Sequence, residues 1–400
     1  MANSILTPTM VTREALVILH QKLNFIGSIN RGYDSSFAVS GAKIGDTLKI
    51  RLPNQYTVRT NATLSTQTTS ESSVTLQVSN QYGVDTSFTS TDLTLSLQDF
   101  SERILEPAMS VLAANVESKA FEMVKDVYQC VDNQTDNSMT LAVVLAARQK
   151  LVEALAPAGK WTSILTPADN VALVNQLKAL FQDSTAIKEQ YREGMMGRTA
   201  GFDFYENTLL SNLTSGTMSQ TSVSRITGTV TPATETSAIT VGNSLVAGTM
   251  VQGDVFTIAT LNRVHPETKA DTGQLQQFVL TTNVTLATNT SISFSPPIIM
   301  SGAKQNVIST AISTQLINKI GASAGVLQQS LFHHRDAFTF ATADLLMPKG
   351  VHFAAREVLD GLSLRIVQQY TISDDAFPAR IDILFGYKTI RPELAVKTWT

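Results

Sequence analysis

The chain has 400 residues and a formal net charge of −3, from 30 Lys and Arg against 33 Asp and Glu. This balance excludes a strongly basic nucleic-acid coat and an acidic disordered tail. Charged residues are only 16% of the chain, against roughly 25% in typical soluble domains, while 49 threonines supply hydroxyl groups instead. A chain that offers so little charge to water is expected to bury much of its surface against other chains.

Cysteine content and hydropathy exclude further classes. The single cysteine, Cys130, allows neither an intramolecular disulfide nor a Cys-based zinc site. The first residues lack a basic segment followed by a continuous apolar one, so we expect no secretory signal. The longest apolar run, 141–147, is far shorter than the ~20 residues that span a bilayer. We therefore expect no membrane partner.

Residues 1–45 are predicted to form an arm. Pro8 begins a helical pattern that places Leu16, Leu19 and Leu23 on one face, and turn residues follow Gly27. A single amphipathic helix cannot bury its own apolar face. The arm must therefore lie on something else.

Residues 46–96 change to the alternating pattern of half-buried strands, at 48–52 and again at 74–78. The connection 61–73 is almost entirely Thr, Ser, Asn and Gln. Two strands with a polar tip are marginal alone. The hairpin either belongs to a β-domain or projects onto a neighbouring subunit, and we expect the second. The charged residues predicted to make contacts between subunits there are Lys49, Arg51, Arg59 and Glu71.

Residues 97–129 carry the strongest helical pattern of the chain. The predicted apolar face consists of Ile104, Ala108, Val111, Leu112, Val116, Ala120, Met123 and Val127. Ser96 is a candidate N-cap, and Asp99 and Glu102 lie near the positive end of the helix dipole. Pro107 should either kink the helix or mark its true start. A helix over the whole range would form a beam roughly 50 Å long.

Residues 138–192 predict helices at 138–155, 167–181 and 184–191, with a strand at 161–166 between the first two. This alternation is typical of an α+β or α/β layer. The glycines Gly194, Gly197 and Gly201 follow. Their spacing fits no nucleotide-binding motif, no strand precedes them, and no Lys-Ser/Thr pair comes after, so we expect a turn that leads into a strand.

Residues 211–297 are rich in Thr and interrupted by Gly and Asn, with short alternating runs and no helical period. This pattern predicts a small all-β barrel or sandwich. Because it lies between two mixed segments, we interpret 213–300 as an inserted domain. After it, a helix is expected at 307–320, with a helical turn near Leu327. The remaining segments predict strands at 336–347, 363–372 and 380–390.

No group of residues predicts catalysis, cofactor binding or a metal site. His333 and His334, with Asp336, could in principle bind a metal ion. However, adjacent residues on a regular element point apart, and no Cys or third clustered His lies nearby in sequence. The pair Asp374 and Asp375 fits a solvated loop, and no Gly-x-Ser-x-Gly nucleophile elbow occurs. Arg and Lys are dispersed, which argues against sequence-specific recognition of nucleic acid.

The order of these elements, together with local motifs, resembles the major capsid (coat) protein of tailed bacteriophages. It is most similar to the coat proteins of short-tailed phages that carry an insertion domain. The segments that carry the resemblance are 197–205, 250–256, 277–279, 295–297, 332–348, 385–387 and 391–394. No single motif decides, but their order along nearly the whole chain is specific.

This resemblance implies an α+β fold: an N-terminal arm (1–45), an extended hairpin loop (46–96), a spine helix with a peripheral domain (97–137), an axial domain (138–212), an inserted β domain (213–300) and a return with the C-terminal strands (301–400). It implies a non-enzymatic protein without cofactors. Hexamers and pentamers would form an icosahedral shell in the virion. Partners would be a scaffolding protein, a portal protein and packaged double-stranded DNA contacted non-specifically, with assembly in the bacterial cytoplasm.

Three other classes of protein fit the sequence less well. A tail-tube or decoration protein would also be Thr-rich, but it needs no long beam helix. A secreted adhesin lacks its signal, and an enzyme lacks its motif.

A Lys–Asn cross-link of the shell, for which Lys49 is available, is not expected. Arg391, fixed by Pro392, is predicted to hold a carboxylate from elsewhere in the subunit or across a subunit boundary, because Glu393 is too near in sequence.

Overall fold

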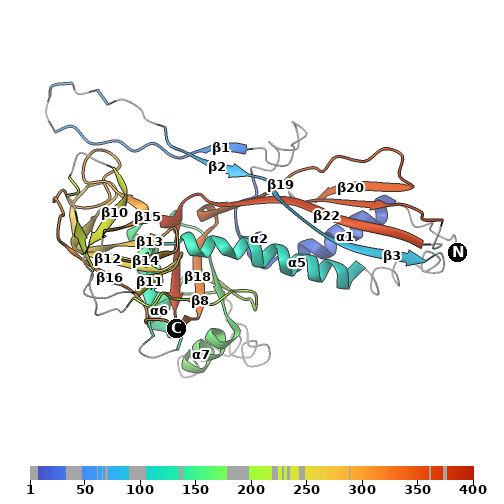
Figure 1. Cartoon of the computed structure of the whole chain (residues 1–400), viewed down its shortest axis with the longest axis horizontal. Coiled ribbons are helices and arrows are strands. Elements are labelled where there is room, and N and C mark those ends of the chain that lie inside the picture. The colour runs from blue at the N-terminus through green and yellow to red at the C-terminus, as the bar shows by residue number, and fades with distance from the viewer. Residues whose placement is uncertain are drawn as a thin grey trace. The chain divides into compact units, whose positions relative to one another are not determined.

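The structure is a computed structural model (Figure 1). It describes residues 8–32, 47–60, 62–64, 66–67, 71–89, 105–134, 138–177, 198–218, 224–227, 229–231, 235–242, 248–287, 289–359, 362–372 and 376–400. The chain divides into two compact units, each with helices and sheets. Unit 1 consists of Met1–Arg51, Ser73–Phe121 and Phe338–Ile390. Unit 2 consists of Leu52–Ser72, Glu122–Ala337 and Arg391–Thr400. No helix among the described residues is both long and apolar enough to cross a bilayer.

The predicted N-terminal helix is present in unit 1 as α1 (Pro8–Lys22), followed by the short α2 (Asn24–Ser28). Leu16 and Leu19 are buried because α1 packs on the sheet of unit 1 and on helix α5 (Glu106–Ala120), and Leu23, just after α1, is also buried. Phe25 of α2 stacks on Phe121 with 4.5 Å between ring centroids. The rest of the predicted arm, 1–7 and 33–45, lies outside the described residues.

The sheet of unit 1 is built around one long strand, β22 (Ala376–Thr389). It pairs with β3 (Asn80–Thr89) along one edge and with β21 (Leu362–Gln368) along the other, since both pair with residues 379–382. β19 (Phe338–Thr342) pairs with its C-terminal part, and β20 (Phe353–Leu359) extends the sheet beyond β21. β19 lies within the predicted strand 336–347, whereas β21 and β22 overlap the predicted strands 363–372 and 380–390 and begin before them.

The predicted hairpin is formed by β1 (Thr47–Arg51) and β2 (Ser73–Gln77), which pair antiparallel. Its burial follows the alternation of the sequence: Ile50 and Leu76, which lie on one face opposite Val74 and Leu48, are buried, while the other face is exposed. The period-two pattern therefore identified both strands and their inner face.

The long helix is shorter than predicted over the described residues. Helix α5 spans Glu106–Ala120, and a 3₁₀ helix, η3 (Phe121–Asp126), continues it. Residues 97–104, with the predicted cap Ser96 just before them, lie outside the described part. Pro107 stands in the first turn of α5, where its missing N–H costs no hydrogen bond.

One residue of the predicted apolar face of α5 is misplaced. Val111 is 58% exposed, whereas the other described members of that face are buried. Buried Met109 and Ala113 define the inner side of the helix, and Val111 falls on the opposite side.

Unit 2 contains a six-stranded sheet in the order β4-β23-β18-β5-β7-β6. These strands are β4 (Cys130–Asp132), β23 (Ala395–Trp399), β18 (Gln329–His334), β5 (Trp161–Leu165), β7 (Phe202–Glu206) and β6 (Arg198–Thr199). The predicted helices are α6 (Leu141–Glu153), capped by the Thr140 hydroxyl that accepts from Val143 N, and α7 (Pro167–Leu177). The predicted helix 184–191 lies outside the described residues.

The Thr-rich segment of unit 2 forms a closed barrel in the order β10-β15-β13-β12-β16-β9. The strands are β9 (Ser224–Thr227), β10 (Thr236–Gly242), β12 (Val255–Val264), β13 (Asp271–Leu280), β15 (Thr290–Ile298) and β16 (Leu316–Lys319). Two short strands, β11 (Gly248–Met250) and β14 (Val284–Leu286), pair beside it. Phe256, Phe278 and Phe294 contact one another in the core, with 5.2 Å between the last two ring centroids.

The helix predicted at 307–320 is wrong, and so is the helical turn near Leu327. Residues 316–319 are β16, which closes the barrel, and Val326–Leu327 is β17, paired with β8 (Leu213–Thr214). Ile308, Ile312 and Leu316 recur every four residues and so mimic a helical face, but β-branched side chains favour a strand when barrel partners are available. The predicted domain end at residue 300 therefore leaves out the strand that closes the barrel.

Candidate assembly surfaces

The tip of the hairpin (52–72) is held by its own polar side chains. Gln67 imitates a strand partner, because its Nε2 donates to Thr57 O at 2.6 Å and its Oε1 accepts from Thr57 N at 2.9 Å. Arg59 Nη1 donates to Ala62 O at 2.6 Å. The two most exposed large apolar side chains of the described tip are Val58, 90% exposed, and Leu64, 79% exposed, and Tyr56 is 58% exposed. Such exposed apolar groups favour a surface that a partner covers.

The four charged residues predicted on the hairpin are all exposed. Lys49 and Arg51 occupy alternate positions of β1, so they share its outer face opposite Thr75 and Ser73. Arg59 and Glu71 belong to the tip. Their use in contacts between subunits stays a prediction.

The expectation that Glu393 is too near in sequence to pair with Arg391 is wrong, while a carboxylate across a subunit boundary stays a prediction. Arg391 Nε donates to Oε1 of Glu393 at 2.8 Å, and the two side chains are 30% and 35% exposed. The short 3₁₀ helix η5 (Pro392–Leu394) turns the chain back on itself, which brings side chains two positions apart together. Nearness in sequence was therefore no obstacle to this ion pair.

The two adjacent histidines have separate environments. His333 is fully buried in β18, and burial, together with the neighbouring His334, lowers its pKa to about 3. His334 Nδ1 lies 3.6 Å from the Asp336 carboxylate and accepts from Asp336 N. Within the described part of the chain, no three His, Cys, Asp or Glu side chains converge on a possible metal position. The pair Asp374 and Asp375 lies outside that part.

The glycine-containing segment forms the predicted turn into a strand. β6 and β7 pair through a turn at Ala200 and Gly201, both with positive φ, of 53° and 88°. Arg148 Nη1 donates to Ala200 O at 3.0 Å. Gly201 therefore serves a left-handed turn that favours glycine. Gly194 and Gly197 lie outside the described residues.

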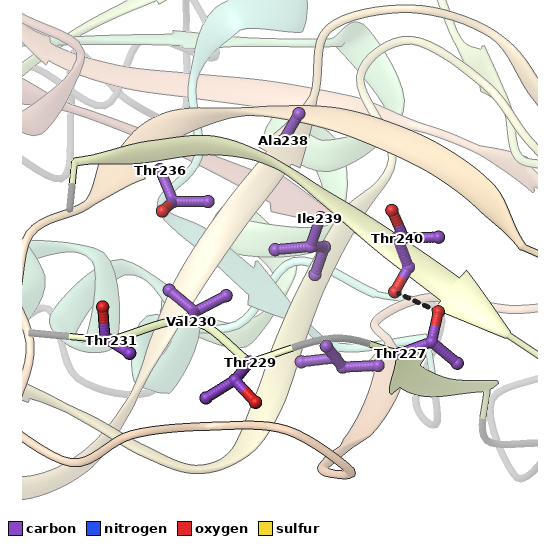
Figure 2. Close-up of a pocket in the computed structure, with 9 residues that line it drawn as sticks. Thr227, Thr229, Val230, Thr231, Thr236, Ala238, Ile239 and Thr240 are labelled. Carbon is purple, nitrogen blue, oxygen red and sulfur yellow. Dashed lines mark hydrogen bonds between the residues drawn. The ribbon is translucent and has the colours of Figure 1, made fainter.

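A hollow of about 270 Å³ lies on the barrel between β9 and β10 (Figure 2). Its described lining is Ile226, Thr227, Thr229, Val230, Thr231, Thr236, Ala238, Ile239 and Thr240. The Thr227 hydroxyl donates to Thr240 O at 3.3 Å, as Figure 2 shows. None of these residues can accept or supply a proton near neutral pH, so the hollow offers no acid–base chemistry.

Sequence reasoning missed a buried polar cluster in unit 2, the junction cluster, formed by Ser215, Gly216, Asp254 and Lys319. Lys319 Nζ lies 2.5 Å from Ser215 Oγ, a spacing that a Ser–Lys nucleophile would have. However, Nζ also donates to Gly216 O at 2.6 Å and to Ala322 O at 3.3 Å. These three acceptors satisfy the three N–H bonds of a charged ammonium group, which fits a structural role for the cluster.

The chain matches one protein family and is similar to several solved structures. A family model described as "P22 coat protein - gene protein 5" matches residues 30–397. Solved structures similar to the chain include Mycobacterium phage Che8 (9% identity, TM-score 0.47, 94% of this chain and 90% of the other). They also include the capsid of Ralstonia phage GP4 (8% identity, TM-score 0.47, 95% and 92%) and that of the cyanophage P-SCSP1u (10% identity, TM-score 0.44, 90% and 84%). No curated protein matches the sequence.

Proposed function

The chain belongs to the P22 coat protein family, and we propose that it builds a closed icosahedral shell of hexamers and pentamers around double-stranded DNA. As a major capsid protein of a tailed bacteriophage it is a homo-oligomeric component of the virion. The observation that carries this function is the family match over residues 30–397. The low charge density supports it, because a near-neutral wall does not hold packaged DNA through phosphate contacts.

The finer parts of the proposal concern partners and regions. A scaffolding protein and a portal would take part in assembly in the bacterial cytoplasm, and the protein would catalyse no reaction. The hairpin with its exposed tip would serve as the clasp between subunits, through Lys49, Arg51, Arg59 and Glu71. The barrel would be an inserted domain, and the sheets of units 1 and 2 would correspond to the peripheral and axial domains.

Negative-stain electron microscopy of the overexpressed protein, with and without its scaffolding protein, tests the proposal. Closed shells of uniform size are the expected result. Tubes or filaments would favour a tail-tube role, and small particles that never assemble, with the scaffold present, would contradict shell formation.

A further inference from the structure

The junction cluster lies where the chain enters and leaves the barrel. β8 leads into the barrel and β17 leaves it, and the two pair as a short stem at Thr214 and Val326. The stem continues with Ser215 N donating to Gly325 O at 2.9 Å and Ala324 N donating to Gly216 O at 3.1 Å. The cluster therefore sits at the barrel end of a two-stranded stem.

Asp254 ties a barrel turn to this stem. Its Oδ1 accepts from Ser215 Oγ at 3.0 Å, and its Oδ2 accepts from Gly216 N at 3.1 Å and Val251 N at 2.9 Å. Asp254 is 0% exposed and Lys319 is 3% exposed. The carboxylate and the ammonium group share Ser215, so the buried charges lie on one hydrogen-bond network.

A second lysine holds the neighbouring residue from the six-stranded sheet. Lys397 Nζ, from β23, donates to Gly253 O at 2.8 Å. Gly253 has a φ of 98°, and a Cβ there would lie 3.4 Å from Leu213 and 3.5 Å from Lys125. The turn is thus held to the stem through Asp254 and to the six-stranded sheet through Gly253.

A different set of contacts fastens the barrel to helix α6. Arg263 of β12 forms an ion pair with Glu153, and Lys150 Nζ donates to Gln277 Oε1 of β13 at 3.0 Å. Gln277 also bonds both backbone groups of Cys130, at 2.9 and 3.0 Å. We call Lys150, Glu153, Arg263 and Gln277 the α6 anchor.

The barrel core is independent of both sets. Its buried apolar residues come from the barrel strands and their connections, with Phe256, Phe278 and Phe294 at the centre, and none belongs to either set. A separate small apolar cluster joins Val255 and Val279 of the barrel to Trp399 of β23. The barrel is thus a closed body that is held by a small apolar contact and by two sets of polar contacts, the junction cluster and the α6 anchor.

From this arrangement we propose that the junction cluster and the α6 anchor are two separable locks on the orientation of the barrel. Opening one lets the barrel pivot on the other without unfolding. Loss of one partner leaves a buried charge uncompensated, which favours local opening over a small adjustment. This inference does not rest on the shell function, since it concerns the unassembled chain.

Electron–electron distance measurements on full-length, unassembled protein test the locks. Spin labels are placed at Ala238→Cys and Ala142→Cys: Ala238 is exposed on β10, opposite β12 in the barrel ring, and Ala142 is exposed on α6. Asp254→Asn and Lys319→Met open the junction cluster, and Glu153→Gln opens the α6 anchor. Each should at least double the width of the label distance distribution, and the combination Asp254→Asn with Glu153→Gln should widen it further.

Hydrogen exchange separates pivoting from unfolding. Residues 215–216 and 251–254 should exchange at least tenfold faster in the junction variants, while β12 and β13 keep their protection. Lys269→Met is the matched control: Nζ of this partly buried lysine donates to Pro266 O at 2.6 Å and Gln305 O at 3.2 Å, both within the barrel. Lys269→Met should change neither the width of the label distance distribution nor the rate of hydrogen exchange in the stem.

Unchanged distance distributions in all three single variants would overturn the proposal. Simultaneous loss of protection in the stem and in β12 and β13 would also overturn it, because the contacts would then hold the fold rather than the orientation. Where a single variant fails to fold, Asp254→Leu with Lys319→Met removes both buried charges. That variant should fold with a widened distribution, and a wild-type width would contradict the lock.

Discussion

Gly83 and Asp382 are register partners on β3 and β22, and the Asp382 carboxylate occupies the space in which a side chain on Gly83 would lie. Its Oδ2 accepts from Arg365 Nη2 at 2.6 Å, and the Asp382 side chain is only 5% exposed. The absence of a side chain on one strand thus makes room for a buried ion pair on the next.

Gly83→Ala should therefore destabilise unit 1. The new Cβ would collide with Asp382 Oδ1 and lie 2.7 Å from Ile381 O, so one strand must shift. We expect a loss of about 1–3 kcal/mol in the free energy of unfolding, measured by denaturant titration. Gly27→Ala is the control, because a Cβ there meets nothing within 4 Å. Equal effects at both glycines would contradict the steric explanation.

Lys397 should make stability rise with pH in alkaline solution. Burial lowers its pKa from 10.5 to about 8, against the opposing effects of Cys130, Asp254 and Asp126. Between these values the unfolded chain binds more protons than the folded one, so the free energy of unfolding increases with pH.

Relative to Lys397→Met, the wild-type protein should gain about 3 kcal/mol between pH 8 and pH 10.5. Thermal melts of both proteins across this window measure the gain. Cys130, whose pKa burial raises to about 12, acts in the opposite sense in both proteins, which is why the variant is the reference. Parallel pH profiles would show that Lys397 titrates normally.

His333 should make the protein labile to acid. Burial first, and His334 second, lower its pKa from 6.5 to about 3, so only the unfolded state is protonated between these values. Stability should fall as pH falls from 6.5 towards 3, by about 1.4 kcal/mol per pH unit. His333→Gln should flatten this slope in pH-dependent melts. His352→Gln, at an exposed histidine, should keep it.

The hairpin tip should be needed for shells but not for folding. Val58→Ser with Leu64→Ser removes two exposed apolar side chains, so the melting temperature should not change while shells are lost. Thr63→Ser in the same tip is the control. Deleting 58–74 should also prevent shell formation, but this deletion removes Ser73 and Val74 of β2. A shorter deletion that ends at residue 71 keeps both residues. Normal yields of intact shells, counted by electron microscopy, would contradict the clasp.

Arg391→Ala should cost little. The pair with Glu393 is about one-third exposed on each side and uses one hydrogen bond, so we expect a loss of 0 to about 1 kcal/mol. Arg391→Lys should behave in the same way. Thermal melts of assembled particles measure both. A loss of several kcal/mol for Ala alone would reveal a desolvated partner in the shell.

The sequence patterns correctly predicted structural features that depend on residues close to one another in sequence. The inner faces of α1 and of the hairpin follow from the spacing of Leu16 and Leu19 and of Ile50 and Leu76. The segment 307–320 was mispredicted because its apolar spacing fits two periods, and the barrel decides between them. The junction cluster joins residues 39 and 104 positions apart, so no local pattern could indicate it.

The position of β23 has a consequence for the order of folding. This last strand lies inside the sheet of unit 2, between β4 and β18, and its five residues are buried. The sheet therefore cannot close until residues 395–399 have left the ribosome. Until then its core would lack Val396 and Trp399, both 0% exposed in the finished protein. Non-local pairing of this kind folds slowly, so a nascent chain would present this apolar surface until those residues emerge.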